Sequence, residues 1–313
     1  MKKTLAFALL ALLLIALVGP AAYAKDSYRF VIVPKVVHPW FDKVHEGALQ
    51  MAEFLSQQTG KEFIIDYRAP SVADVVMQNN IIEQAAATRP DGIAVDLLDG
   101  DGNRAVIESV MGLGIPVVIF DSEAPADLGL LSIGNDFAEQ AAIAAERLVE
   151  LLGGKGKVAI MQGVPTAPNH RIRYEAHKAT LAKYPGIEIV AEGIDNDDIE
   201  TAQQQAAAIL AAHPDLDGFL SCNAAGPIGI GLAIREAGRA GRVLSVGMDD
   251  LDQLLVLIEE GVVDSSSSTK PYLQGQWTVL SMWLAREGMP LPKTIDTGIA
   301  IITRDNLDTY QSE

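Results

Sequence analysis

The chain has 313 residues with 24 basic and 41 acidic side chains, which give a net charge of −17 at neutral pH. An acidic surface favours solubility and disfavours binding to nucleic acid or to anionic membranes. The one cysteine, Cys222, excludes an intrachain disulfide and a multi-cysteine metal site, so packing alone must stabilise the fold.

Residues 1–24 have the pattern of a secretory signal peptide. Two lysines precede an apolar run, and the small-residue sequence AYA ends at Ala24. The run is shorter than the roughly 20 apolar residues that a membrane-spanning helix needs. We therefore expect cleavage after Ala24 and a secreted mature protein without direct membrane insertion.

Short apolar runs alternate with segments of helical period, such as Trp40–Leu55, almost from end to end. The runs predict strands, in chain order, at Arg29–Val33, Glu62–Tyr67, Gly92–Val95, Pro116–Phe120, Leu130–Ile133, Lys157–Met161, Ile187–Ala191, Gly218–Ser221, Arg242–Val246, Val263–Ser267 and Thr297–Ile302. Such alternation predicts an α/β fold of parallel sheets covered by helices on both faces. The length favours two doubly wound lobes, and no low-complexity linker separates them.

Polar residues follow four of the predicted strands. Asp96, Asp121, Asn223 and Asp249 each come directly after an apolar run. Ligands bind outside the carboxyl ends of the strands in open parallel sheets. Each residue alone can instead cap the helix that follows it, but four together indicate a shared site.

The first predicted strand, RFVIV, leads through Lys35 to His38 and the adjacent aromatic residues Trp40 and Phe41. The C–H faces of a sugar ring pack on aromatic planes, while carboxylates and amides bond its hydroxyls. The combination predicts a site for a polyhydroxylated ligand. The alternative for the two aromatic residues is that they are plain core residues.

From Arg29 to about Ile302 the sequence resembles the periplasmic sugar-binding proteins of the ribose-binding type, which deliver ligands to ABC importers. The resemblance lies in PKVVHPWFDKVHEGA, GIPVVIFDSEA, QGVPTAPNHRIRYEAH, AAHPDLDGFLSCNAAGPIGI and VLSVGMDD. It implies the type I periplasmic binding protein fold and a periplasmic location. It also implies a monomer that binds a small sugar or polyol and a membrane permease, without a cofactor or a metal ion.

The resemblance also assigns ligand contacts residue by residue. The expected ligand-binding residues are His38, Trp40, Phe41, Asp96, Asp121, Arg173, Asn223 and Asp249. Further candidates are Lys35, Ser122, His170, Asp197 and Thr269.

The family closes two lobes about a three-segment hinge, with ligand contacts from both lobes stabilising the closed form. By analogy the crossings fall near Asn135, Lys270 and Thr297. The N-terminal lobe is then expected to comprise residues 25–135 and 271–297, and the C-terminal lobe residues 136–270 and 298–313.

Three departures from the ribose-binding pattern bear on the ligand. His38 and Asp96 stand where ribose binders have asparagine, and Ser122 replaces an arginine. The site gains an acid and loses a base, which favours a neutral sugar, a polyol or an amino sugar over ribose, a sugar acid or a phosphate. The lysine in VIVPK and the sequence DSE also resemble rhamnose- and autoinducer-2-binding relatives, so that ligand class stays open.

Three functions remain as hypotheses. The first is a transport receptor, and the second is a signalling or chemotaxis receptor of the same fold. The third is a secreted carbohydrate hydrolase, which would need paired carboxylates across a cleft, such as Asp121 and Asp249. The sequence has no G-x-S-x-G motif, and its five histidines lack metal-ligand spacing. We therefore expect a binding protein with no catalytic residues.

Overall fold

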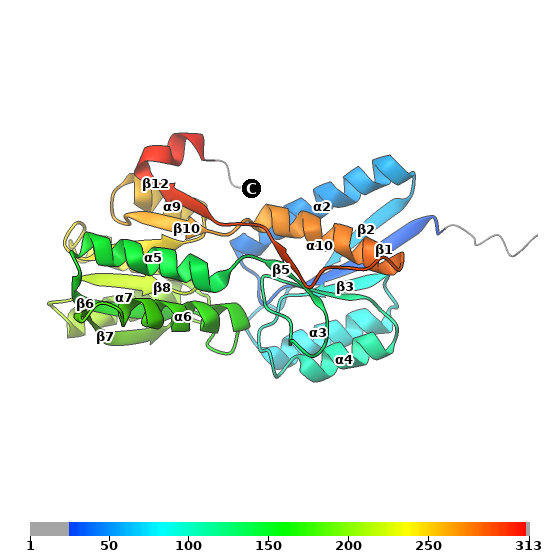
Figure 1. Ribbon diagram of the computed structural model, residues 1–313, viewed down its shortest axis with the longest axis horizontal. Coiled ribbons are helices and arrows are strands. Elements are labelled where there is room, and N and C mark those ends of the chain that lie inside the picture. Colours follow the sequence, from blue (N-terminus) through cyan, green and yellow to red (C-terminus); the bar gives the residue numbers. More distant parts are fainter. Residues whose placement is uncertain (1–24, 311–313) are drawn as a thin grey trace, which may run out of the picture.

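The computed structural model describes residues 25–310, so the predicted signal peptide and its cleavage site lie outside the described residues. The chain forms two six-stranded sheets that lie side by side in separate lobes (Figure 1). The strand order is β11-β5-β4-β3-β1-β2 in the first sheet and β12-β10-β9-β8-β6-β7 in the second. Helices cover both faces of each sheet, and the predicted α/β fold with two doubly wound lobes is confirmed.

The first lobe contains β1 (Ser27–Val33), α2 (Pro39–Thr59), β2 (Glu62–Tyr67), α3 (Val75–Ala87), β3 (Gly92–Val95), α4 (Arg104–Gly112), β4 (Val117–Phe120), β5 (Leu131–Gly134), α10 (Pro271–Arg286) and β11 (Thr294–Asp296). The second contains α5 (Phe137–Leu151), β6 (Lys155–Gln162), α6 (Pro168–Leu181), β7 (Gly186–Ile194), α7 (Ile199–Ala212), β8 (Gly218–Ser221), α8 (Ala225–Glu236), β9 (Leu244–Met248), α9 (Asp252–Glu259), β10 (Ser265–Ser268), β12 (Ala300–Thr303) and a short 3-10 helix (Arg304–Thr309). Strands β3, β4 and β8 are buried along their whole length, as expected for parallel strands covered on both faces.

The start of α2 fixes the position of the aromatic pair that follows β1. His38 caps the helix, because its Nδ1 accepts the backbone N–H of Trp40 at 3.2 Å. Pro39 suits the first turn, where no N–H is needed. Trp40 and Phe41 therefore lie in the first turn of α2, just beyond the carboxyl end of β1.

Helices α2 and α10 pack with their backbones in contact (Figure 1). A Cβ atom on Gly47 would lie 1.9 Å from the carbonyl oxygen of Tyr272, and one on Gly275 would lie 2.0 Å from that of Val44. Only glycine permits so close an approach. The contact holds α10, which follows β10 of the second lobe in the chain, on the first lobe.

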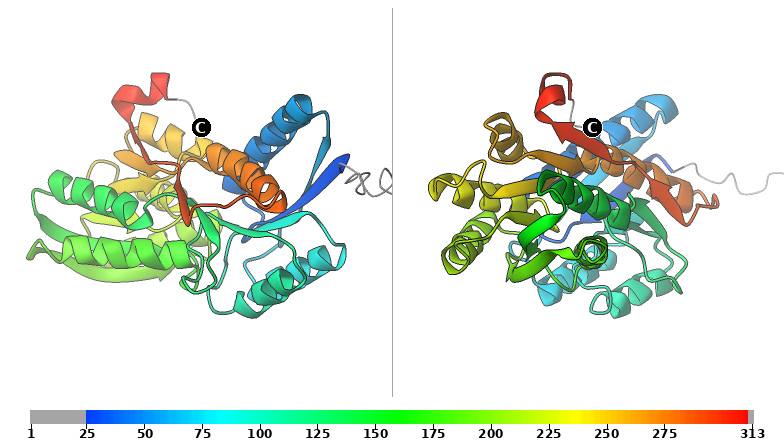
Figure 2. Two further views of the ribbon diagram at one scale, coloured as in Figure 1. Left: turned by 45° about the vertical axis from the view of Figure 1, so that its right-hand side comes forward. Right: turned by 60° about the vertical axis from the view of Figure 1, so that its left-hand side comes forward.

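The chain passes between the lobes three times, from β5 to α5, from β10 to α10 and from β11 to β12 (Figure 2). The third crossing is tied to the first, because the backbone N and the Oγ1 of Thr297 donate to Gly134 O at 2.7 and 2.9 Å. Sheet membership does not fix the residue at which a lobe ends. The lobe boundaries given above therefore stay a prediction.

The predicted strand Thr297–Ile302 begins three residues too early, because only Ala300–Ile302 of it belongs to a strand, β12. This segment contains the third crossing, with β11 ending at Asp296 in one sheet and β12 beginning at Ala300 in the other. Gly298 interrupts the extended backbone with a φ of 82°. Strand β12 also pairs antiparallel with β10, so the second sheet is not wholly parallel. Within residues 25–310 no helix is long and apolar enough to cross a membrane.

Candidate ligand-binding site between the lobes

Side chains from both lobes meet around a small hollow. Nine residues singled out from the sequence line it together with Ala224: Lys35, His38, Trp40, Phe41, Asp121, His170, Arg173, Asp197 and Asp249. Its cavity volume is about 10 Å³, roughly what one water molecule needs and far below the roughly 300 Å³ at which small-molecule pockets usually begin. In this closed form the lining side chains nearly fill the space between the lobes.

Lys35 lies at the centre of the charges on the first lobe. Its ammonium is 2.9 Å from Asp96 Oδ2 and 3.2 Å from Asp121 Oδ2, and its side chain is almost fully buried. Burial alone would lower the pKa of Lys35, but the surrounding carboxylates outweigh it and hold that pKa above its ordinary value. Lys35 therefore stays charged and offsets part of the negative charge of the site.

Asp121 presents an acceptor to the hollow. Its Oδ2 accepts hydrogen bonds from Lys35 Nζ at 3.2 Å and from the Asn169 amide at 2.9 Å. Its Oδ1 is buried and has no hydrogen-bond partner among the described residues. A buried carboxylate oxygen without a partner is costly, so Asp121 Oδ1 is suited to accept a ligand hydroxyl.

Two histidines supply donors. His38 Nδ1 accepts the N–H of Trp40, and His170 Nδ1 accepts the N–H of Val164 at 2.9 Å. An imidazole nitrogen that accepts carries no proton, so each ring has its proton on Nε2. Burial, reinforced by Lys35, lowers the pKa of His170 well below its ordinary value, so this ring is neutral. His38 Nε2 is buried without a partner in the described part of the chain.

The aromatic wall of the hollow comes from the start of α2. The rings of Trp40 and Phe41 meet edge to face at 5.0 Å, and Phe41 meets Phe120 in the same way at 6.4 Å. The indole N–H of Trp40 donates to Thr269 Oγ1 at 3.1 Å, and Thr269 Oγ1 donates to Asp249 Oδ1 at 2.6 Å. Trp40 is therefore held in place by the second crossing and by a carboxylate of the second lobe.

Arg173 brings a guanidinium from α6. Its Nε donates to Gln140 Oε1 at 3.0 Å and its Nη1 to the carbonyl of Cys222 at 3.3 Å. The guanidinium also lies over the ring of Phe137 at 4.9 Å. All three contacts come from residues of the second lobe, so this lobe alone orients the Arg173 side chain toward the hollow.

Asn223 holds two aspartates of the second lobe, Asp195 and Asp197, by hydrogen bonds. Its amide donates to Asp195 at 2.7 Å and to Asp197 at 2.9 Å, and its Oδ1 accepts the N–H of Gly226 at the start of α8. Burial raises the pKa of Asp195 well above its ordinary value. Burial also acts on Asp197, but the groups around it, Lys35 and the Asn223 amide among them, outweigh burial and lower that pKa. Of these two aspartates, Asp197 is therefore the ionised one, and it is also the one that lines the hollow.

Three of the lining carboxylates have left-handed backbone conformations. The φ angles are 45° for Asp121, 61° for Asp197 and 66° for Asp249. Aspartate adopts this region more readily than most residues, but at a cost, and such strain concentrates at functional sites. The three carboxylates are therefore held toward the hollow by turns that the surrounding structure imposes.

Four predicted contacts lie one step behind the lining. Ser122 Oγ donates to Asp96 Oδ1, and Asp96 in turn contacts Lys35. Burial raises the pKa of Asp96 well above its ordinary value, against the attraction of Lys35. Asn223 and Thr269 likewise bond lining residues. Direct ligand contact by these four residues stays a prediction.

Sequence reasoning missed Asn169, Ala224 and Asp195. Asn169 is fully buried in the first turn of α6, and its amide connects Lys35 and Asp121 of the first lobe to the second. It lies inside the segment QGVPTAPNHRIRYEAH, but no strand end or spacing distinguishes it there. Asp195 follows β7, a long and half-exposed strand whose end the periodicity did not mark.

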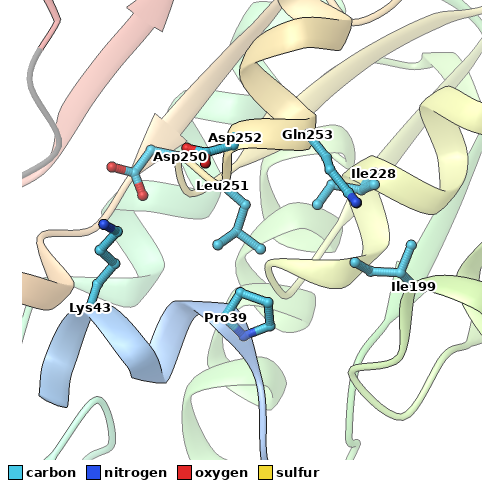
Figure 3. Close-up of a pocket in the computed structure, with 8 residues that line it drawn as sticks. All are labelled: Pro39, Lys43, Ile199, Ile228, Asp250, Leu251, Asp252 and Gln253. Atoms are coloured by element: carbon cyan, nitrogen blue, oxygen red, sulfur yellow. The ribbon is translucent and has the colours of Figure 1, made fainter. Parts of the chain in front are cut away.

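A groove opens at the seam between the lobes beside the hollow (Figure 3). Pro39 and Lys43 of α2 face Leu251 of the second lobe across it. Ile199, Ile228, Asp250, Asp252 and Gln253 complete its lining. Pro39 adjoins His38 in the chain and Asp250 adjoins Asp249, so the groove lies next to the hollow.

Two α/β lobes whose strand ends enclose a polar hollow with an aromatic wall define a ligand-binding protein of the closing type. Residues 29–289 match the family model described as a periplasmic binding protein domain. The chain therefore belongs to the periplasmic binding protein family, whose members are substrate-binding proteins rather than enzymes.

Relatives in this family bind sugars. The chain is 25% identical over 305 residues to a xylose/arabinose-binding protein of Sulfolobus acidocaldarius, covering 91% of this chain and 73% of the relative. It is 29% identical over 249 residues to a D-ribose/D-allose-binding protein of Pseudomonas aeruginosa, covering 77% of each. The solute-binding protein of an ABC transporter from Burkholderia graminis, solved with D-arabinose, superposes with a TM-score of 0.85 at 29% identity, covering 92% of this chain and 98% of that one.

Proposed function

We propose that this protein captures a monosaccharide-like ligand, a neutral sugar, a polyol or an amino sugar, between its lobes and delivers it to the permease of an ABC importer. The observation that carries the proposal is the convergence of nine predicted residues from both lobes on one hollow. The sugar-binding relatives and the periplasmic family support the same function. Cleavage after Ala24 would release the mature form.

The geometry suggests a role for each group. Trp40 and Phe41 would pack against the C–H face of the ring. Asp121 Oδ1, Asp197 and Asp249 would accept hydroxyl protons, and His38, His170 and Arg173 would donate to hydroxyl oxygens. The mixture of acceptors and donors fits a polyhydroxylated molecule better than an anion, because carboxylates would repel an anion.

Closure would couple the two lobes through the ligand. Asn169 already bonds Asp121 across the cleft, and Thr166 Oγ1 on the rim donates to Leu98 O at 3.2 Å. A ligand that touches both lobes favours this closed form by its extra contacts there. Because the family consists of substrate-binding proteins, we propose that the ligand leaves unchanged.

Titration calorimetry of the mature protein tests the proposal. The panel is D-arabinose, D-xylose, D-ribose, D-allose, D-fucose, L-rhamnose, xylitol and D-glucosamine. We expect one-to-one binding, tightest for a single member, and chromatographic recovery of that sugar unchanged. Heat from none of the eight would contradict the proposal, and conversion of the bound sugar would favour the hydrolase.

One observation favours a second ligand class, rhamnose or an autoinducer-2-like signal. Lys35 is buried beside Asp121 and lines the hollow, and the VIVPK segment that carries it resembles proteins of that class. L-rhamnose as the tightest member of the panel would support this alternative. Uptake measured in cells with and without the cognate permease would separate transport from signalling or chemotaxis.

A further inference from the structure

Both the oxygen and the nitrogen of the Gln140 side-chain amide form hydrogen bonds. Its Oε1 accepts from Arg173 Nε at 3.0 Å and from Asn135 Nδ2 at 3.2 Å, and its Nε2 donates to Ser267 O at 2.8 Å. The hydroxyl of Ser267 returns a bond to the Gln140 carbonyl at 3.2 Å. Gln140 is fully buried. A buried amide with each of its groups engaged has one orientation, and so have the groups bonded to it.

Arg173 depends on that orientation. Its side chain is almost fully buried, and in the described chain its hydrogen-bond acceptors are two neutral oxygens, Gln140 Oε1 and Cys222 O. Phe137, one turn before Gln140 on α5, lies under the guanidinium. No carboxylate holds the guanidinium within ion-pair distance among residues 25–310. Its direction into the hollow is therefore set by α5, and the polar contact from α5 is Gln140.

The other bonds of Gln140 reach the hinge. Asn135 lies in the first crossing, directly after β5, and α5 begins two residues later (Figure 1). Ser267 lies in β10, directly before the second crossing. Thr297 in the third crossing is bonded to Gly134. Gln140 thus joins a ligand-facing side chain to two of the three segments whose backbone must rotate when the lobes open.

We propose that Gln140 is a positioning residue that aims Arg173 at the ligand and transmits ligand contact at Arg173 to the first two crossings. The proposal rests on the function proposed above, because it requires Arg173 to touch the ligand. Without the amide, Arg173 loses the acceptor of its Nε, and the crossings lose their common partner. Binding then weakens even though Gln140 touches no ligand atom.

A double-mutant cycle tests the proposal. The variants are Gln140→Met, Arg173→Met and the double variant, titrated with the tightest-binding sugar of the panel. We expect Arg173→Met to weaken binding about a hundredfold and Gln140→Met about tenfold. The double variant should bind no more weakly than Arg173→Met, because Gln140 acts through a guanidinium that is then absent. Circular dichroism and the unliganded Tm confirm that each variant folds.

Gln140→Glu separates positioning from packing. It keeps an acceptor for Arg173 Nε but removes the donor to Ser267 O, so we expect its affinity to fall between that of Gln140→Met and that of wild type, since the aim of Arg173 is kept and the link to the second crossing is lost. Affinity of Gln140→Met within twofold of wild type would overturn the proposal, as would full additivity with Arg173→Met. If Arg173→Met itself binds normally, Arg173 is not a ligand contact, and that part of the proposed function fails instead.

Discussion

The indole N–H of Trp40 donates to Thr269 Oγ1 at 3.1 Å across 229 positions of sequence. Trp40 lies in the first turn of α2 in one lobe, and Thr269 lies between β10 of the other lobe and α10. The Thr269 hydroxyl also donates to Asp249, so this one hydroxyl joins the Trp40 indole of the first lobe to a lining carboxylate of the second. A change in the spacing of the lobes must therefore disturb the surroundings of this indole.

Trp40→Phe keeps an aromatic ring but removes the indole N–H. We expect sugar affinity to fall about tenfold, through the lost hydrogen bond and smaller ring, and the ligand-induced change in tryptophan fluorescence to disappear. Trp277→Phe is the matched control, since Trp277 is 37% exposed on α10 and outside the hollow. A fluorescence response that persists in Trp40→Phe and vanishes in the control would place the reporter elsewhere.

Asp121→Asn tests the central acceptor. Loss of a charge-assisted hydrogen bond to a ligand hydroxyl should weaken binding about a hundredfold in calorimetry. Stability should change little, because burial raises the pKa of Asp121 and its charge is unfavourable in the fold. The control Asp127→Asn removes a carboxylate that is 67% exposed and pairs with Arg104. Equal affinity of the two variants would remove Asp121 from the site.

Much of the site could be predicted because parallel sheets concentrate ligand contacts at strand ends. Asp121 and Asp249 directly follow short apolar runs, and Trp40 follows a strand and a helix-capping residue. Each of these positions can therefore be recognised from a single sequence. Asn169 could not be found in this way. Its role depends on how the second lobe docks against Lys35 and Asp121, and docking is a property of the closed form rather than of any local pattern.

The third crossing shows the same limit in the fold. TGIAII reads as one extended segment, yet Gly298 breaks it, and only Ala300–Ile302 belongs to a strand, β12, while β11 of the other sheet ends just before the segment at Asp296. Sequence periodicity reports that a backbone is extended and not which neighbour it pairs with. Strand β11 pairs with β5, which lies far from it in the sequence, and β12 pairs with β10 in the other lobe, so no local pattern reveals either partner.

His177 predicts how stability depends on pH. It is fully buried with Nε2 2.9 Å from Ser221 O, and burial lowers its pKa from 6.5 to about 4. The folded ring therefore stays neutral below pH 6.5 while the unfolded one gains a proton, so its contribution to stability is complete above pH 6.5 and falls as the pH drops toward 4.

This contribution can be measured by difference. Between pH 7 and pH 5, urea unfolding of wild type should lose about 2 kcal/mol more than unfolding of His177→Asn, which has no proton to gain. His213→Asn, on a loop residue at the end of α7, is the control. Equal losses in wild type and His177→Asn would mean that the folded ring protonates normally.

Asn169→Ala tests the direct bond between the lobes. In the closed form the Asn169 amide donates to Asp121 Oδ2 at 2.9 Å and accepts from Lys35 Nζ at 3.3 Å, and neither bond needs a ligand. Bonds to charged groups contribute about 1.5 to 3 kcal/mol, so their loss should shift the closed-to-open ratio about tenfold or more. Small-angle scattering should then show a larger radius of gyration for unliganded Asn169→Ala than for unliganded wild type, and the two should converge at saturating sugar.

Thr166→Val removes another bond between the lobes, at the half-buried rim, and should have a smaller effect because water can replace that partner. Identical radii for unliganded Asn169→Ala and wild type would show that Asn169 does not hold the lobes together, and closure would then depend on the ligand alone.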